Sequence, residues 1–214
     1  MYDLWVQHWR KQQARGEVIV VRFADDTVVG FQYESDAKSF QKELKERLLK
    51  FGLELHPEKT RLIEFGRFAA ENRKKRKEGK PDTFTFLGFT HICGKTRKDG
   101  KFAIWRHTIK KRLHAKVKEI KEELTKRMHD PVQKVGQWLK AVVTGHYRYY
   151  GVPGNGYAMG DFRYLISQRW HQTLRRRGQK GLITWEKMRK LVDRWIPPPQ
   201  ICHEYPNKRF GVII

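Results

Sequence analysis

The sequence is poor in cysteine and contains no long apolar run. Its two cysteines, Cys93 and Cys202, are far apart and follow no spacing typical of zinc ligands, so neither a zinc site nor a disulfide framework is predicted. A membrane-spanning helix needs about 18 or more consecutive apolar residues, and no such stretch occurs. Asp3, Gln7 and His8 occupy the region where a secretory signal would have its apolar core. We therefore expect a reducing, intracellular setting and no membrane partner.

Acidic residues are scarce relative to basic ones. The 214 residues include 46 Lys and Arg against 23 Asp and Glu, which gives a formal net charge of +23. An excess of this size, spread along the chain, indicates a polyanionic partner such as nucleic acid. A membrane surface is the competing partner, but no lipidation signal is present.

Two β-branched apolar runs, at residues 18–21 and 27–31, flank the sequence Ala24-Asp25-Asp26. Valine and isoleucine favour strands and aspartate favours turns, so the pattern predicts a β-hairpin with two carboxylates at its tip. Each carboxylate raises the cost of ionising the other, and a divalent metal ion would relieve that cost. From these residues alone, an ordinary polar turn and a metal site fit equally well.

The rest of the first half alternates between helical and strand patterns. Ser35 or Asp36 is expected to cap a helix that Gly52 ends. In chain order, the expected elements are a helix over residues 2–15, the hairpin, a helix over 35–51, strand pieces at 53–55 and 60–63, a solvated basic loop over 67–81, a strand at 84–89 and its partner at 102–105.

The composition changes near Thr108, where apolar residues begin to recur at helical spacing between lysines and arginines. Trp138 and Trp170 are expected in the core of this part. Helices are predicted from residue 109 to 124, from 131 to about 150, from 162 to 177 and from 185 to 195, before prolines 197–199. The second half is therefore predicted to be a small basic helical bundle.

The sequence Phe23-Ala24-Asp25-Asp26, between apolar strands, resembles the Tyr/Phe-x-Asp-Asp motif of reverse transcriptases. The order of an amphipathic helix, residues 52–60 and then Phe86-Leu87-Gly88-Phe89 resembles the later palm motifs of reverse transcriptases encoded by group II introns. Residues 145–151 resemble the thumb of that family, also called the maturase or X domain. Residues 203–210 are similar to the end of many bacterial members.

The resemblance implies an α+β fold, in which a partial palm of antiparallel sheet and packed helices precedes an all-helical thumb. The implied domains are the C-terminal part of the palm at residues 1–106, the thumb or maturase-specific domain at 107–196, and a tail at 197–214. Family members also carry fingers and a further aspartate on an earlier palm strand, whereas only 24 residues precede Asp25. We therefore expect the C-terminal part of such an enzyme, cytoplasmic and of prokaryotic type, with a separate N-terminal half as a possible partner.

The family's chemistry implies a role for each matched residue. Asp25 would ligate the two Mg²⁺ ions that catalyse nucleotidyl transfer from dNTPs, and Asp26 would be a second ligand or an electrostatic neighbour. Lys59 would donate a proton to the departing pyrophosphate, although a solvated turn explains it equally well. Phe86, Leu87, Gly88 and Phe89 would form the hairpin that holds the primer end, and a buried strand with a bulge is the alternative.

Basic residues are the candidate contacts to intron RNA and to an RNA template with its DNA primer. Tyr147, Tyr149 and Tyr150 could stack on bases or belong to the core. The candidate contacts, each of which could instead be simply solvated, are Arg73, Lys74, Lys75, Arg76, Lys77, Arg148, Arg163, Arg175, Arg176 and Arg177.

These expectations lead to one principal function and two alternatives. The principal function is RNA-directed DNA polymerase of a group II intron, combined with a maturase role in intron splicing and mobility. Without the upstream aspartate and fingers, the chain alone is expected to be inactive. A non-catalytic, intron-RNA-binding splicing factor and a decayed fragment are the alternatives. No His-Asn-His nuclease pattern follows the thumb, so endonuclease activity is not expected.

Overall fold

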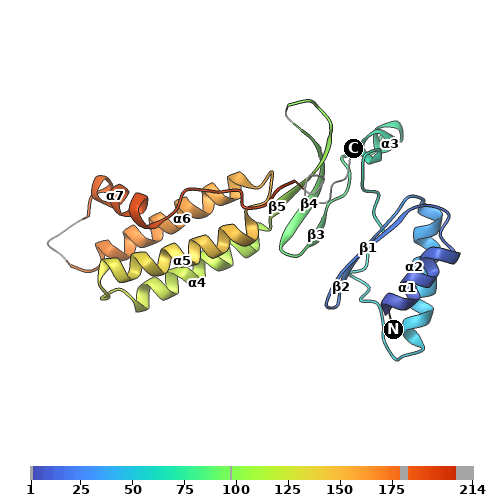
Figure 1. Ribbon diagram of the computed structural model, residues 1–214, viewed down its shortest axis with the longest axis horizontal. Helices are drawn as coiled ribbons and strands as arrows, with labels where there is room; N and C mark the ends of the chain where they lie inside the picture. The colour runs from blue at the N-terminus through green and yellow to red at the C-terminus, as the bar shows by residue number, and fades with distance from the viewer. Residues whose placement is uncertain (1, 97, 179–182, 206–214) are drawn as a thin grey trace. The chain divides into compact units, whose positions relative to one another are not determined.

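The computed structural model describes residues 2–96, 98–178 and 183–205, and its fold is α+β (Figure 1). The chain forms two compact units, residues 1–65 and 66–214, which we call the N-terminal and C-terminal units. Each unit has its own hydrophobic core. Among the helices of the described residues, none has the length and apolar character that crossing a bilayer requires.

The N-terminal unit is a two-stranded hairpin covered by two helices. It consists of α1 (Tyr2–Gln12), β1 (Val18–Phe23), β2 (Asp26–Phe31) and α2 (Glu34–Leu49). The strands are antiparallel, and their register places Val18 opposite Phe31 and Phe23 opposite Asp26. The hairpin predicted from the two β-branched runs is therefore confirmed.

Aromatic rings fill the core of the N-terminal unit. Val6, Trp9, Val18 and Phe40 are buried there. The indole of Trp9 meets Phe40 edge-on, with ring centroids 5.0 Å apart, and meets Phe31 in the same way at 5.9 Å. One face of the hairpin thus packs against both helices, which fixes the strand register and with it the position of the turn.

The two ends of α2 differ in how well they were predicted. Gly52, with φ of 67°, takes the left-handed conformation expected after a helix, and the Leu53 amide donates to Leu48 across it. The predicted N-terminal cap is wrong, because neither Ser35 nor Asp36 caps α2, and Tyr33 stands at the N-cap without a side-chain bond. Asp36 is buried instead, and its carboxylate accepts the amides of Arg15 and Gly16 at 2.9 and 3.2 Å.

Residues 53–55 and 60–63 form no strand, so that prediction is wrong. A strand needs a neighbour for its backbone groups, and none of the described strands pairs with this segment. The chain turns instead at His56, whose carbonyl accepts the amides of Lys59 and Thr60.

The C-terminal unit joins a three-stranded antiparallel sheet to a helical bundle. The sheet has the order β3-β4-β5, and Figure 1 shows it at one end of the bundle and α7 at the other. The elements are α3 (Ala69–Lys75), β3 (Phe84–Phe86), β4 (Phe89–Lys95), β5 (Phe102–Thr108), α4 (Lys110–Lys126), α5 (Val132–Tyr150), α6 (Gly156–Arg175) and α7 (Trp185–Trp195).

Two predictions for this unit are corrected. The basic segment expected to be a solvated loop contains α3, which ion pairs to later residues hold in place. The single strand expected at residues 84–89 is two short strands joined by a turn at Leu87 and Gly88, because both turn residues adopt positive φ.

The bundle core confirms the predicted helical stripes. Leu124, Leu139, Phe162 and Trp170 are fully buried at the centre of the cluster. Trp138 is only half-buried; it packs against the cluster while the Arg127 guanidinium covers its ring at 4.9 Å. Burying this many large side chains supplies the main stabilisation of the bundle.

Candidate functional site

The tip of the β1–β2 hairpin carries the two adjacent carboxylates. Phe23 ends β1 and Asp26 begins β2, so Ala24 and Asp25 are the two residues of the turn. Ala24 has a φ of 53°, which is uncommon for a residue with a side chain. Phe23 is 63% exposed, so it does not pack beneath the hairpin. The turn therefore presents Phe23, Asp25 and Asp26 together at the surface of the N-terminal unit.

The charges around this tip leave both aspartates without a basic partner. Arg22 is the neighbouring cation, and its Nη2 is 2.7 Å from Asp3 Oδ2. No ion pair joins Asp25 or Asp26 to any other residue of the described chain, and both side chains are exposed. Two like charges therefore stand side by side with no internal neutralisation.

Carboxylate oxygens of this kind suit Mg²⁺, which prefers hard oxygen ligands. Asp25 and Asp26 could provide part of the ligand set of such a site. Across residues 2–96, 98–178 and 183–205, however, no group of three His, Cys, Asp or Glu side chains could hold a metal ion. The described residues thus place two adjacent carboxylates at this tip and no third candidate ligand beside them.

Lys59 lies in the same unit as the two aspartates. The structure places it in the exposed turn that begins at His56, with its amide 3.2 Å from the His56 carbonyl. No described contact brings its side chain to Asp25 or Asp26, so its role as a proton donor stays a prediction.

The turn at Leu87 and Gly88 is a tight β-hairpin rather than a bulged strand. Their φ angles are 48° and 82°, and Phe86 pairs directly with Phe89 across the turn. Positive φ at both central residues is the pattern that matches the twist of a two-residue hairpin. The turn therefore has a fixed backbone shape.

The end of α5 holds this turn in place. The Tyr149 hydroxyl donates to the Leu87 carbonyl at 2.9 Å, and the ring of Phe89 lies 5.3 Å from that of Tyr150. A β-carbon at Gly88 would stand 3.0 Å from the Tyr150 hydroxyl oxygen. Gly88 therefore allows a close approach of this tyrosine to the turn.

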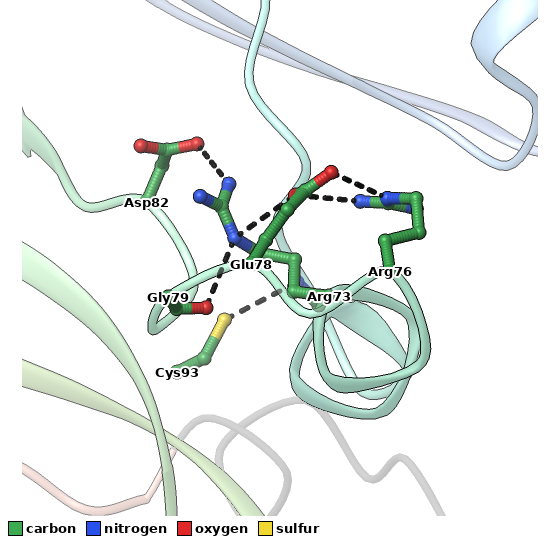
Figure 2. Close-up of polar contacts among 7 residues, drawn as sticks. Arg73, Arg76, Glu78, Gly79, Asp82 and Cys93 are labelled. Carbon is green, nitrogen blue, oxygen red and sulfur yellow. Dashed lines mark hydrogen bonds and ion pairs between the residues drawn. The ribbon is translucent and has the colours of Figure 1, made fainter.

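The basic residues of α3 fall into two groups. Arg73 pairs with Asp82 at 2.8 Å and donates to the Gly79 carbonyl at 3.3 Å (Figure 2). Arg76 makes a two-pronged contact with Glu78, at 2.7 and 3.1 Å. The hydrogen bond from Arg76 holds the pKa of Glu78 below its usual value. The two arginines are thus engaged within the loop, whereas Lys74, Lys75 and Lys77 are exposed.

The arginines of the helical bundle do not form one patch. Arg148 is exposed near the C-terminal end of α5, and Arg175 and Arg176 are exposed at the C-terminal end of α6, toward the other end of the bundle. Arg163 links α6 to α7, because its guanidinium donates to the Ile196 carbonyl at 3.3 Å and pairs with Asp193. Burial lowers the pKa of Arg177.

Sequence reasoning missed Glu78, Asp82 and Lys80. The two acids pair with Arg73 of α3 and with Arg76 directly after it, and the lysine lines the same hollow as Lys74 and Lys77. Acidic residues shortly after a basic run were the available signal. The sequence left open whether the three tyrosines belong to the core or are available for stacking on bases. Tyr147 is a core residue with 2% exposure, whereas Tyr149 is 50% exposed.

Comparison with known proteins identifies a relationship for part of the chain. Residues 1–91 match the family model described as reverse transcriptase (RNA-dependent DNA polymerase). No curated protein matches the chain. The matched range includes the Asp25-Asp26 tip, Lys59, α3 and the Leu87-Gly88 turn, and it ends within β4. This part of the chain is therefore similar to reverse transcriptases.

Proposed function

We propose that the chain contributes the metal-binding hairpin and a nucleic-acid-binding helical part to a reverse transcriptase of the group II intron type. The observation that carries the proposal is the exposed pair Asp25 and Asp26, held at a two-residue turn inside the range that matches the family. The division into palm, thumb and tail at residues 106/107 and 196/197 is part of the proposal. The function also places the chain in the cytoplasm with intron RNA, where it acts as a maturase in splicing and mobility.

The proposed chemistry is transfer of a nucleotide from a dNTP to the 3′ end of a primer. Two Mg²⁺ ions, when bound, stabilise the attacking and leaving oxygens of this in-line displacement. In this chain, Asp25 and Asp26 would hold the cations, and the hairpin register keeps these two residues together at the turn. Lys59 carries a proton that it donates to an oxygen of the departing pyrophosphate.

The Leu87-Gly88 turn is proposed to support the primer end. Its shape is set before any nucleic acid binds, because the Tyr149 hydroxyl donates a hydrogen bond to the Leu87 carbonyl and the Tyr150 side chain lies close to Gly88. A contact surface with a fixed backbone orients a substrate without the entropic cost of ordering a loop.

Two carboxylates do not complete a two-metal site, and the described residues add no third ligand. We propose that an aspartate from another segment, supplied by a separate N-terminal half, completes it. Primer extension on an RNA template, with the chain alone and with such a half added, tests this. Incorporation of dNTPs that Asp25→Ala and Asp26→Ala abolish, and that the exposed control Glu46→Ala leaves unchanged, supports the proposal. Absence of incorporation in both mixtures contradicts it.

A non-catalytic intron-RNA-binding factor is the second candidate. It is favoured by the formal net charge of +23 and by the lysines beside α3. Under this function, the Asp25→Ala/Asp26→Ala variant binds intron RNA as the wild type does. Preference for the chain's own intron RNA over unrelated RNA of equal length supports it, and equal weak binding to both argues against it.

A further inference from the structure

A hollow of about 460 Å³ lies beside α3 in the C-terminal unit. Its lining residues are Ala70, Lys74, Lys77, Glu78, Gly79, Lys80 and Pro81. Lys74 belongs to α3, and Lys77 and Lys80 lie in the following loop. Three lysines from a stretch of seven residues therefore line one hollow.

The lysines of this hollow have no internal counter-charge. In the part of the chain that the structure describes, no ion pair involves Lys74, Lys77 or Lys80. Glu78 lines the same hollow, but both of its carboxylate oxygens are bound to Arg76, and Arg73 Nε lies 3.6 Å from one of them. The acid at the site is thus already neutralised by arginines, and the positive charge of the lysines remains.

The backbone at Lys77 provides a second, independent indication. Lys77 has a φ of 59° and stands where a helix normally ends with glycine. The Lys77 amide donates to the Lys74 carbonyl, and the Glu78 amide donates to the Arg73 carbonyl at 2.8 Å, which is the bonding pattern of a Schellman motif. Lysine is less favourable than glycine in this conformation, which is consistent with a use for its side chain.

The same motif reduces an electrostatic obstacle. The last carbonyls of a helix are partly negative and would repel an anion. At α3, the carbonyls of Asn72, Arg73 and Lys74 accept backbone amides of the following residues. The C-terminal end of α3 is therefore closed by the chain itself.

We propose that Lys74, Lys77 and Lys80 form a binding site for a backbone phosphate of a nucleic-acid strand, and that Arg73 and Arg76 are positioning residues that shape it. The site rests on the proposed function for its partner. It divides the basic run of α3 into lysines that bind and arginines that hold the loop through Glu78, Asp82 and the Gly79 carbonyl.

The presence of lysine rather than arginine favours contacts to phosphate groups over contacts to bases. An ammonium group is a point charge that lacks the planar fork of arginine, and a phosphate oxygen is an acceptor that suits such a charge. Contacts of this type fix the position of a strand and carry no sequence information. Binding through the hollow is therefore independent of sequence and strongly dependent on salt.

The test is binding of the full chain to a fluorescently labelled single-stranded RNA of mixed sequence, from about 50 to about 200 mM salt. In Lys74→Gln/Lys77→Gln/Lys80→Gln, affinity should fall by about three- to tenfold at the higher salt, and the slope against log salt should decrease by about 0.7 for each phosphate that the variant no longer neutralises. The matched control, Lys11→Gln/Lys42→Gln/Lys45→Gln, removes the same charge elsewhere. An equal loss of affinity in both variants would show that only net charge matters and would overturn the site.

Lys77→Gly separates binding from folding. Glycine relieves the positive φ, so the variant should melt at or above the wild-type temperature while binding RNA more weakly. If Lys77→Gly binds RNA as tightly as the wild type, the lysine has no role in binding and the proposal fails.

Two further measurements identify the ligand and separate this proposal from the proposed function. Inorganic phosphate or a dNTP that binds to the wild type and not to the triple glutamine variant, with RNA binding unchanged, would make this a site for free phosphate and overturn the assignment. If the wild type extends a primer and the triple glutamine variant binds RNA normally, the lysine site is wrong and the proposed polymerase function stands. If the wild type does not extend a primer but the triple glutamine variant selectively loses RNA binding, the lysine site stands and the polymerase function does not.

Discussion

Asn155 joins the end of the sheet to the helical bundle through Thr108. Its Oδ1 accepts the Thr108 amide at 3.0 Å, and its Nδ2 donates to the Thr108 hydroxyl at 2.8 Å and to the Tyr150 carbonyl at 2.8 Å. Asn155 is 1% exposed and Thr108 is 6% exposed. One buried amide thus uses both of its ends to hold β5 and the end of α5 together.

Asn155→Ala should destabilise the C-terminal unit by about 2–4 kcal/mol, because it removes these bonds and leaves a buried Thr108 amide unsatisfied. Urea unfolding monitored by circular dichroism measures the change. Thr108→Ser, which keeps the hydroxyl, should cost less than half as much. A midpoint for Asn155→Ala equal to that of the wild type would show that water replaces the side chain without cost.

Gly88→Ala should destabilise the same unit by about 1–2 kcal/mol, since alanine at a φ of 82° is strained and its β-carbon would meet the Tyr150 hydroxyl. The matched control is Gly160→Ala within α6, where nothing lies within 4 Å of the added carbon. That substitution should stabilise the helix by up to about 1 kcal/mol. Thermal melts of both variants measure these effects. A lower melting temperature for Gly160→Ala than for Gly88→Ala would contradict the role given to Gly88 in the turn.

His146 should make the C-terminal unit sensitive to acid. It is 7% exposed and stacks on Phe162 at 3.7 Å, and its Nε2 has no hydrogen-bond partner among the described residues. Burial, with a smaller effect of Lys116, lowers its pKa to about 4 from the usual 6.5. The unfolded chain then binds more protons than the folded chain below pH 6.5. The stability that His146 contributes is therefore complete above that pH and is lost as the pH falls toward 4.

The expected loss from His146 is about 2 kcal/mol between about pH 7 and about pH 5. His146→Phe keeps an aromatic ring against Phe162 and cannot take up a proton. The difference in unfolding free energy between this variant and the wild type, followed against pH, isolates the histidine from the carboxylates. Parallel pH curves for the two proteins would refute the prediction.

Asp36→Ala should destabilise the N-terminal unit by about 2–3 kcal/mol, because the Arg15 and Gly16 amides lose a charged acceptor. Ser35→Ala removes only the 3.3 Å bond from the serine hydroxyl to the same carboxylate, so it serves as the control. Its expected cost is about 0.5 kcal/mol. Chemical denaturation is read through tryptophan fluorescence in a background where the five tryptophans of the C-terminal unit are replaced by phenylalanine, so that the signal comes from Trp5 and the buried Trp9. Equal midpoints for the two variants would show that the Asp36 carboxylate does not stabilise this unit.

The sequence predicted those elements whose signal is local. β-branched runs on both sides of Ala24-Asp25-Asp26 predicted the hairpin, and apolar residues at helical spacing predicted α4 to α7, because each pattern buries one face whatever the rest of the chain does. The helix α3 was missed, since Arg73 is held by Asp82, nine residues later, and a charged run by itself favours a solvated loop.

The same distinction applies to the candidate site. Placing two carboxylates at a turn needed only the residues beside them. The support of the Leu87-Gly88 turn by Tyr149 joins residues 62 positions apart, and no short-range pattern contains that contact. Likewise, the motif at Lys77 depends on a backbone conformation that lysine itself disfavours.

The two separate cores have a thermal consequence. The core of the N-terminal unit rests on Val6, Trp9, Val18 and Phe40, whereas the bundle buries sixteen residues in one cluster. Since stability grows with the apolar area buried, the smaller unit should melt first on heating. Over that interval the carboxylate hairpin would be lost while the bundle and the lysine hollow remained folded. Under the proposed function, a warmed sample should therefore continue to bind nucleic acid after it has lost the hairpin that carries Asp25 and Asp26.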